Sequence, residues 1–212
     1  MSTPLFTVHV IDDDPALRTA LGRLLAASGY AVSLHESATA FLSLSLDHGP
    51  GHACILLDVD MPGMSGLQLQ EQLARDGHPM PVIFLTGHGD VAMSVRAVKA
   101  GAEDFLLKPV ARLALLDAVE RARARVAAQD GERTAAALLQ GRLESLTPRE
   151  REVFVLVVQG LLNKQIAYQL GNTERTVKAQ RASVMEKMQA ATLAELVMLA
   201  ARLGLIGPGA AL

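Results

Sequence analysis

The sequence predicts a doubly wound α/β domain with a five-stranded parallel sheet, followed by a helical linker and a small all-α domain that carries a helix-turn-helix. Strand and helix patterns alternate strictly over the first part of the chain, which indicates parallel βαβ units with helices on both faces of the sheet. A short apolar run that ends in Asp58 has the length of a buried strand. Residues 146–212 contain only helical patterns.

Each predicted strand leads into a turn or a helix. Asp14 and Pro15 are typical of the start of a helix, as an N-cap and a first-turn proline. Pro62 and Gly63 force a loop after the strand that ends in Asp58, before a new helical pattern begins near Leu67. The predicted strands cover residues 6–11, 30–34, 53–58, 81–86 and 104–108. Five helices are predicted. The first starts at Pro15, the second includes Phe41 to Leu46, the third starts near Leu67, the fourth covers residues 91–100, and the fifth starts at Leu113.

We expect a domain at residues 1–124, a linker at 125–145 and a second domain at 146–212. The linker is rich in Ala, Arg and Gln, and Asp130-Gly131 predicts a break in its helix. Its leucines give it one apolar edge, which either packs on one of the chain's own domains or forms a dimer seam. Those leucines are Leu138, Leu139 and Leu143.

The second domain has clear helix boundaries. Thr147 and Glu150 form a capping box around the first-turn Pro148. A short helix over residues 164–170 ends at Gly171, and a longer helix starts at Thr173. A short helix, a glycine-containing turn and a longer helix are the pattern of a helix-turn-helix.

The composition argues against a membrane-spanning or secreted protein. Half of the 212 residues are hydrophobic, yet no apolar run approaches the ~20 residues of a membrane span, and no secretory signal is recognisable. The single cysteine, Cys54, is expected to be a small buried hydrophobe, and a reducing cytoplasm fits. The three segments carry net charges of −5, 0 and +3, which indicates two modules with different partners.

Polar side chains end four of the predicted strands, and parallel strands bring their carboxyl ends to one crevice. Clustered carboxylates recruit a hard cation, and Mg²⁺ suits them because it prefers oxygen ligands and keeps phosphate oxygens in its shell. Lys108 and Mg²⁺ would neutralise a phosphoryl group, Thr86 would donate a hydrogen bond to it, and Asp58 would be the nucleophile of an acyl phosphate. The converging residues are Asp12, Asp13, Asp58, Thr86 and Lys108.

Residues 5–122 resemble the flavodoxin-like receiver domain of two-component response regulators. The resemblance rests on Ile11-Asp12-Asp13-Asp14, on the run from Leu57 to Gly66, on Leu85-Thr86-Gly87-His88 and on Phe105 to Pro109. It implies a chain that is no enzyme beyond its own phosphotransfer and slow dephosphorylation.

The resemblance also implies a role for each matching residue. Asp58 accepts a phosphoryl group from a sensor histidine kinase, while Asp12, Asp13 and the carbonyl of Asp60 join it around Mg²⁺. Thr86, Phe105 and His88 are switch residues. Lys108 precedes a cis peptide bond to Pro109, and Asp60 and His88 tune the lifetime of the acyl phosphate.

Residues 146–205 resemble the LuxR-type helix-turn-helix of NarL/FixJ regulators, and the chain as a whole resembles the FixJ/StyR-like subgroup. This resemblance rests on the run from Leu146 to Val153, on Asn163 to Ala167 and on Thr176 to Lys178. It implies binding to double-stranded DNA, a homodimer on phosphorylation, no membrane partner, and RNA polymerase as a further candidate partner.

The predicted recognition helix runs from residue 173 to residue 188. Val177, Val184 and Met188 fall on its inner face at helical spacing, so other positions face the major groove. Base edges would be met by Lys178, Ala179 and Ala182. Phosphates would be met by Lys164, Thr173, Arg175, Thr176, Arg181 and Lys187. Gln180 departs from the family, which usually has histidine at that position.

Two other readings compete. Asp58-Val59-Asp60 fits the Asp-x-Asp of a haloacid-dehalogenase-like phosphatase, but such enzymes place it after the first strand, have Thr or Val where Pro62 stands, and have no use for a helical module. A receiver that switches without phosphate is the second alternative, and the complete set of pocket residues argues against it.

Overall fold

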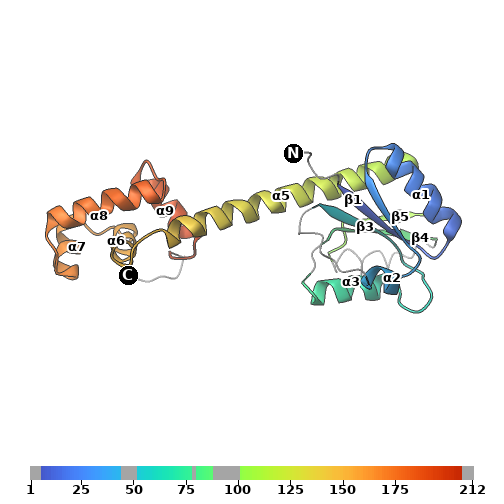
Figure 1. The fold of residues 1–212 in the computed structure, drawn as a ribbon, viewed down its shortest axis with the longest axis horizontal. Helices are drawn as coiled ribbons and strands as arrows, with labels where there is room; N and C mark the ends of the chain where they lie inside the picture. The colour runs from blue at the N-terminus through green and yellow to red at the C-terminus, as the bar shows by residue number, and fades with distance from the viewer. Residues whose placement is uncertain (1–5, 44–51, 78–79, 88–100, 207–212) are drawn as a thin grey trace. The chain divides into compact units, whose positions relative to one another are not determined.

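The structure is a computed structural model that describes residues 6–43, 52–77, 80–87 and 101–206 (Figure 1). The chain divides into two compact units, residues 1–131 and residues 132–212. Each unit has a core of its own, so the two are described separately. Among the described residues, no helix is both long enough and apolar enough to cross a membrane.

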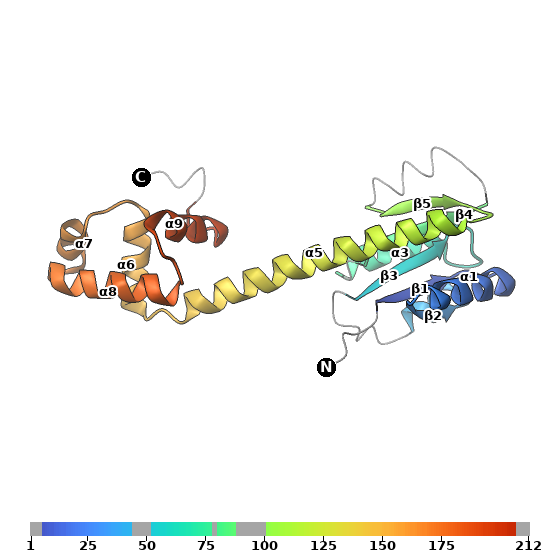
Figure 2. The same ribbon diagram turned by 90° about the horizontal axis from the view of Figure 1, so that it is seen from above.

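The first unit is built on a five-stranded sheet in the order β2-β1-β3-β4-β5, and every neighbouring pair is parallel (Figure 2). Thr7 pairs with Ala53 and Ile11 with Leu57, so β1 and β3 end level with each other. The predicted α/β class and strand arrangement are confirmed. The strands are β1 (Thr7–Ile11), β2 (Ala31–His35), β3 (Ala53–Asp58), β4 (Val82–Thr86) and β5 (Asp104–Leu107).

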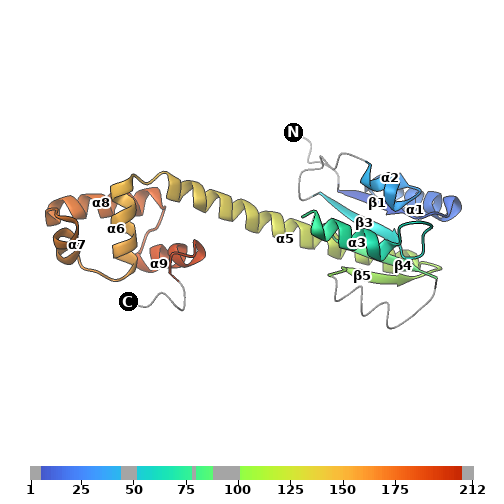
Figure 3. The ribbon, with the colours of Figure 1, turned by 90° about the horizontal axis from the view of Figure 1, so that it is seen from below.

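Helices cover both faces of this sheet (Figures 1 and 3). On one face, α1 (Pro15–Ala27) and the first part of α5 (Arg112–Glu144) pack against alternate residues of the strands. On the other face lie α2 (Ala38–Leu42) and α3 (Gly66–Arg75). Every residue of β3 is buried, which explains why its sequence is a continuous apolar run rather than an alternating pattern.

Three further expectations from the sequence can be compared with the structure, with different outcomes. The second strand begins and ends one residue later than predicted, and His35 is buried at its end. The third predicted helix is confirmed by α3, whereas the fourth, at residues 91–100, and His88 lie outside the described residues. Cys54 is fully buried, and burial raises the pKa of its thiol to about 12, as suits a small hydrophobic residue.

The predicted break in the linker is wrong. α5 continues through Asp130 and Gly131 to Glu144, as one helix of 33 residues. Its first part is anchored by Leu115 and Val119 in the core of the first unit, and its last turns by Leu139 and Leu143 in the core of the second. Anchoring at both ends stabilises the exposed stretch between them, although a glycine costs about 0.5–1 kcal/mol there.

The second unit contains four further helices around one core. They are α6 (Pro148–Val158), α7 (Asn163–Leu170), α8 (Glu174–Lys187) and α9 (Leu193–Arg202). Phe154 and Leu196 are fully buried between them. Because Leu139 and Leu143 join this core, two of the three linker leucines pack on their own unit, whereas Leu138 is exposed.

Two glycine substitutions should change stability in opposite directions. An added Cβ at Gly66 would lie 2.3 Å from the carbonyl oxygen of Asp58, so Gly66→Ala should destabilise the fold by about 1–3 kcal/mol. At Gly131 nothing lies within 4 Å, so Gly131→Ala should stabilise by about 0.5–1 kcal/mol. Thermal unfolding followed by circular dichroism measures both. A Gly66→Ala protein as stable as the wild type would contradict the close approach of Gly66 to the carbonyl of Asp58.

Candidate phosphoacceptor pocket and DNA-reading helix

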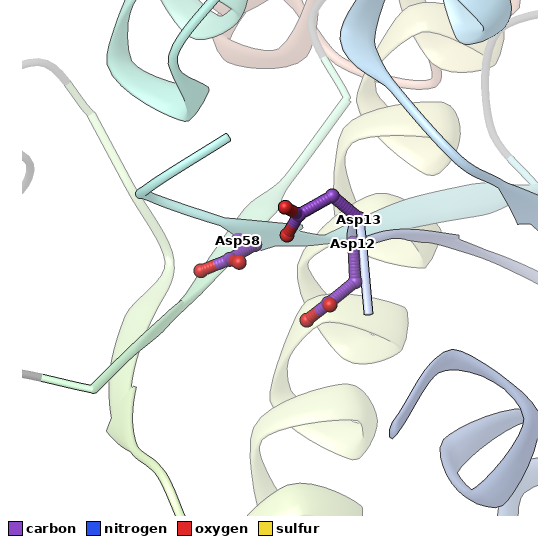
Figure 4. Close-up of side chains that lie close together, drawn as sticks. All are labelled: Asp12, Asp13 and Asp58. Carbon is purple, nitrogen blue, oxygen red and sulfur yellow. The ribbon is translucent and has the colours of Figure 1, made fainter. Parts of the chain in front are cut away.

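Three carboxylates meet where β1 and β3 end (Figure 4). Asp12 and Asp13 directly follow β1, and Asp58 is the last residue of β3. One oxygen from each lies within 4.8 Å of the others. Asp12 and Asp58 are buried, while Asp13 is exposed. The site is therefore an acidic pocket with one side open to solvent, as the parallel sheet predicted.

Lys108 supplies the opposite charge. Its Nζ lies 2.8 Å from Oδ2 of Asp12 and 2.9 Å from Oδ2 of Asp58. Burial raises the pKa of Asp58. The hydrogen bond and charge of Lys108 act in the opposite direction but do not cancel it, so the net direction is upward. Burial alone would lower the pKa of Lys108, but the two carboxylates outweigh it and the net direction is upward. Lys108 thus stays a cation and favours the ionised form of Asp58, which nucleophilic attack requires.

Backbone contacts fix these groups. The amide of Asp14 donates to Oδ1 of Asp12 at 2.9 Å, and Arg18 Nη1 donates to the Asp12 carbonyl at 2.6 Å. The amide of Lys108 donates to the carbonyl of Thr86 at 2.7 Å, which ties the end of β5 to the end of β4. The Lys108–Pro109 bond is cis, as the resemblance implied. Sequence reasoning had not identified Arg18, whose only signal is its position one turn into α1.

Three further predicted residues lie on, or directly after, the strands of this part of the sheet. Thr86 is fully buried at the end of β4. Phe105 is partly buried, and its ring centroid lies 6.2 Å from that of Phe84. Asp60 is exposed, and its amide lies 3.4 Å from Oδ1 of Asp58.

The donor set suits a hard divalent cation. Asp12, Asp13 and Asp58 offer carboxylate oxygens alone, without sulfur or imidazole, within the span that one ion can bridge. Such a set favours Mg²⁺ or a similar ion over zinc or copper. An acidic pocket of this kind also explains why the cation of Lys108 is drawn into it.

The second unit presents α8 as an exposed helix after a tight turn. Gly171 ends α7 in the left-handed region with φ of 62°, and the side chain of Thr173 caps α8 by accepting from the amide of Thr176. Val177, Val184 and Met188 are fully buried, as predicted for the inner face. The three predicted base-reading residues are all exposed: Lys178, Ala179 and Ala182.

The predicted phosphate-contacting residues fall into two groups. Four of them are exposed: Lys164, Thr173, Arg175 and Thr176. Two are engaged within the unit. Arg181 Nη1 donates to Oδ1 of Asn163 at 3.2 Å, and Lys187 Nζ lies 2.6 Å from Oε2 of Glu150. Lys187 therefore supports the fold of the unit as well as adding charge to its surface.

Glu150 connects the start of α6 to α8. Besides closing the predicted capping box with Thr147, it accepts from Ser183 Oγ and from Lys187 Nζ, each at 2.6 Å. The hydrogen bonds from Lys187 and Ser183 lower the pKa of Glu150 to about 2. The capping box was visible in the sequence, whereas the contacts to α8 were not.

Comparison with known proteins decides the family. The family described as the response regulator receiver domain matches residues 8–120, and the luxR family of bacterial regulatory proteins matches residues 144–200. The chain is 49% identical over 195 residues to the transcriptional regulatory protein FixJ of Azorhizobium caulinodans, covering 91% of this chain and 90% of that protein. The chain belongs to the NarL/FixJ family of two-component response regulators.

Two further comparisons agree with the subgroup. FixJ of Rhizobium meliloti is 43% identical over 195 residues, which covers 92% of this chain and 95% of that protein. The solved structure of the response regulator StyR aligns with a TM-score of 0.83 at 43% identity, over 94% of this chain and all of that one. For this response regulator, the phosphatase reading is therefore rejected: Asp58 ends the third strand of a receiver, and a LuxR-type DNA-binding domain follows it.

The DNA-binding unit should lose stability in acid because of Glu150. Its folded pKa of about 2 lies below the ordinary value of 4.5, so its contribution is fully present above about pH 4.5 and is lost as the pH falls towards 2. Glu150→Gln should flatten this part of the pH profile. Urea unfolding at a series of pH values, read from NMR signals of α6 and α8, measures it.

Glu186→Gln is the matched control, since Glu186 is an exposed acid on α8 itself. It should keep the wild-type acid sensitivity. Equal flattening by both substitutions would show that general charge, rather than the Glu150 contacts, sets the profile.

Proposed function

We propose that this response regulator is switched by phosphorylation of Asp58 and then binds specific promoter sites to control transcription. The observation that carries the proposal is Lys108 Nζ held between the carboxylates of Asp12 and Asp58 at the strand ends. A cation there can follow the phosphoryl group onto Asp58 and stabilise the charge that builds up on its oxygens. The phosphoryl donor is a sensor histidine kinase.

In the transfer, an oxygen of Asp58 forms a bond to phosphorus while the bond from phosphorus to the donor breaks. Lys108 neutralises a phosphoryl oxygen, and Thr86 donates a hydrogen bond to another. Mg²⁺ would be held by Asp12, Asp13 and Asp58, with the carbonyl of Asp60 as a further ligand. When bound, the ion offsets negative charge on the phosphoryl oxygens. The chain then catalyses nothing but its own transfer and slow dephosphorylation, with Asp60 and His88 tuning the latter.

We assign residues 1–124 to the receiver, 125–145 to the linker and 146–212 to the DNA-binding domain. Lys178, Ala179 and Ala182 would read base edges, because all three are exposed on α8 opposite its buried face. The exposed cations would contact phosphates. With a kinase and DNA as partners, and RNA polymerase as a candidate partner, we place the protein in the cytoplasm.

Phosphorylation would strengthen DNA binding chiefly through dimerisation. A DNA-binding domain with a net charge of +3 makes few phosphate contacts, so one copy binds weakly at physiological salt. Two linked copies gain ~10²–10⁴ through effective concentration. The proposed pairing surface comprises residues 91–100, which lie outside the described residues, and residues 104–107, beside Phe105 and Lys108. The strand β5 is at the edge of the sheet, and Leu107 at its end and Leu113 at the start of α5 are exposed, which supports this surface. Relief of inhibition by the receiver is the competing mechanism.

Asp58→Asn should abolish Mg²⁺-dependent labelling by acetyl phosphate or by a phosphorylated kinase, because an amide oxygen is a far weaker nucleophile than a carboxylate. Asp14→Asn is the control. Asp14 caps α1 through Ala16 and Leu17, and asparagine caps a helix equally well. Labelling of both variants at the wild-type rate would refute Asp58 as the acceptor.

Leu107→Asp should prevent dimerisation without preventing labelling, because the charge disrupts an apolar surface outside the pocket. Analytical ultracentrifugation of the labelled full-length protein, with duplex binding measured in parallel, tests this. Leu138→Asp serves as the control, since Leu138 is an exposed leucine on the linker part of α5. If the labelled Leu107→Asp protein stayed monomeric and still bound DNA as tightly as the labelled wild type, relief of inhibition would replace dimerisation.

A further inference from the structure

The recognition helix α8 ends in a strained turn. Its C-cap is Met188, and the next residue, Gln189, has a φ of 54°. Within the described part of the chain, Gln189 is the one residue other than glycine that has a positive φ. A side chain in this region costs free energy, and such a conformation persists where the surroundings fix the backbone on both sides.

The backbone is fixed on both sides of Gln189. The amide of Gln189 donates to the carbonyl of Glu186 at 3.0 Å, and the amide of Ala190 donates to the carbonyl of Met185 at 2.9 Å. Ala190 is buried, so the chain cannot relax outward after the turn. On the other side, the carbonyl of Met188 accepts from outside α8.

That contact comes from the end of α5. Nη1 of Arg142 lies 3.5 Å from the carbonyl oxygen of Met188. The distance is long for a hydrogen bond, but a cation at the carbonyl end of a helix is also favoured by the helix dipole. Leu139 and Leu143 flank Arg142 in sequence and are buried in the same core as Val184 and Met188. The last turns of α5 therefore share a hydrophobic core with the end of the recognition helix.

The end of α5 is itself held in place. Nη2 of Arg151, on α6, donates to the carbonyl of Leu143 at 3.1 Å. The amide of Ser145 donates back to the carbonyl of Gly141 at 3.1 Å and completes the last turn. α8 is thus held from two directions, by Glu150 of α6 along its side and by Arg142 of α5 at its end.

We infer that Arg142 is a positioning residue for DNA reading: from the linker helix it holds the strained end of α8 and so sets the direction in which the base-reading side chains point. Base contacts depend on the orientation of the recognition helix, whereas contacts to phosphates tolerate small rotations. Arg142 lies in the last turn of α5, the helix that begins at Arg112. The inference rests on the proposed function, in which the phosphorylated chain selects particular DNA sequences.

The test measures the preference of the protein for one DNA sequence over another. A residue that positions the recognition helix should affect this preference more than it affects the affinity for DNA of any sequence. A duplex is first selected from a random-sequence library with the phosphorylated wild-type protein, and a scrambled duplex of the same composition is the comparison. Arg142→Gln should reduce the ratio of the two affinities about tenfold while changing affinity for the scrambled duplex less than about twofold. Arg142→Lys, which keeps the charge, should restore part of the ratio.

Arg133→Gln is the matched control, because Arg133 is an exposed arginine on the same helix. It removes one positive charge and should leave the ratio unchanged. If Arg142→Gln left the ratio unchanged, whether or not it weakened binding to the selected and scrambled duplexes in parallel, the inference would be overturned. Failure of the wild-type protein to select any duplex would instead count against the proposed function.

A double substitution examines the strained turn directly. Gln189→Gly removes the cost of the left-handed conformation, so the turn no longer depends on Arg142. In that background, Arg142→Gln should lower the ratio of affinities by less than about threefold, against about tenfold in the native background. Equal effects in the two backgrounds would show that Arg142 does not act through this turn.

Discussion

The receiver unit depends on one electrostatic constraint: two carboxylates are buried side by side at the ends of β1 and β3, and a cation must compensate them. Lys108 provides that cation from the end of β5, at 2.8 and 2.9 Å from Asp12 and Asp58. Removing one partner of such a buried cluster leaves uncompensated charge, which is costly. The same arrangement is ready for a phosphoryl group and a divalent cation, because each changes the charge balance that Lys108 now satisfies.

The surrounding fold serves to keep these groups close. A parallel sheet brings the carboxyl ends of its strands to one edge, and the level register of β1 and β3 sets Asp12 beside Asp58. Gly66 lets the following helix return so closely that any Cβ would contact the carbonyl of Asp58. In the DNA-binding unit a different buried charge has the corresponding role, since Glu150 holds Ser183 and Lys187 of α8 against the start of α6.

The sequence was sufficient for the sheet and the acidic pocket because their signals are local. Apolar runs that end in Asp58 or Thr86 identify strand ends, and the geometry of parallel sheets then joins residues far apart in the chain. The sequence was insufficient where contacts between residues far apart in the chain decide the local structure. Asp130-Gly131 predicts a break, but α5 is anchored by leucines in two cores and stays helical. The ion pair of Lys187 with Glu150 was not predicted, because Glu150 lies 37 residues away in the chain.

We propose that phosphorylation of Asp58 in the receiver controls DNA binding by the second unit. The most direct measurement is the affinity of the full-length protein for a selected duplex, at one salt concentration, before and after treatment with acetyl phosphate and Mg²⁺. Treatment with acetyl phosphate and Mg²⁺ should tighten binding of the wild-type protein to the duplex at least about tenfold. The affinity of the Asp58→Asn protein should stay unchanged. Equal tightening of both proteins, or of neither, would contradict the proposal.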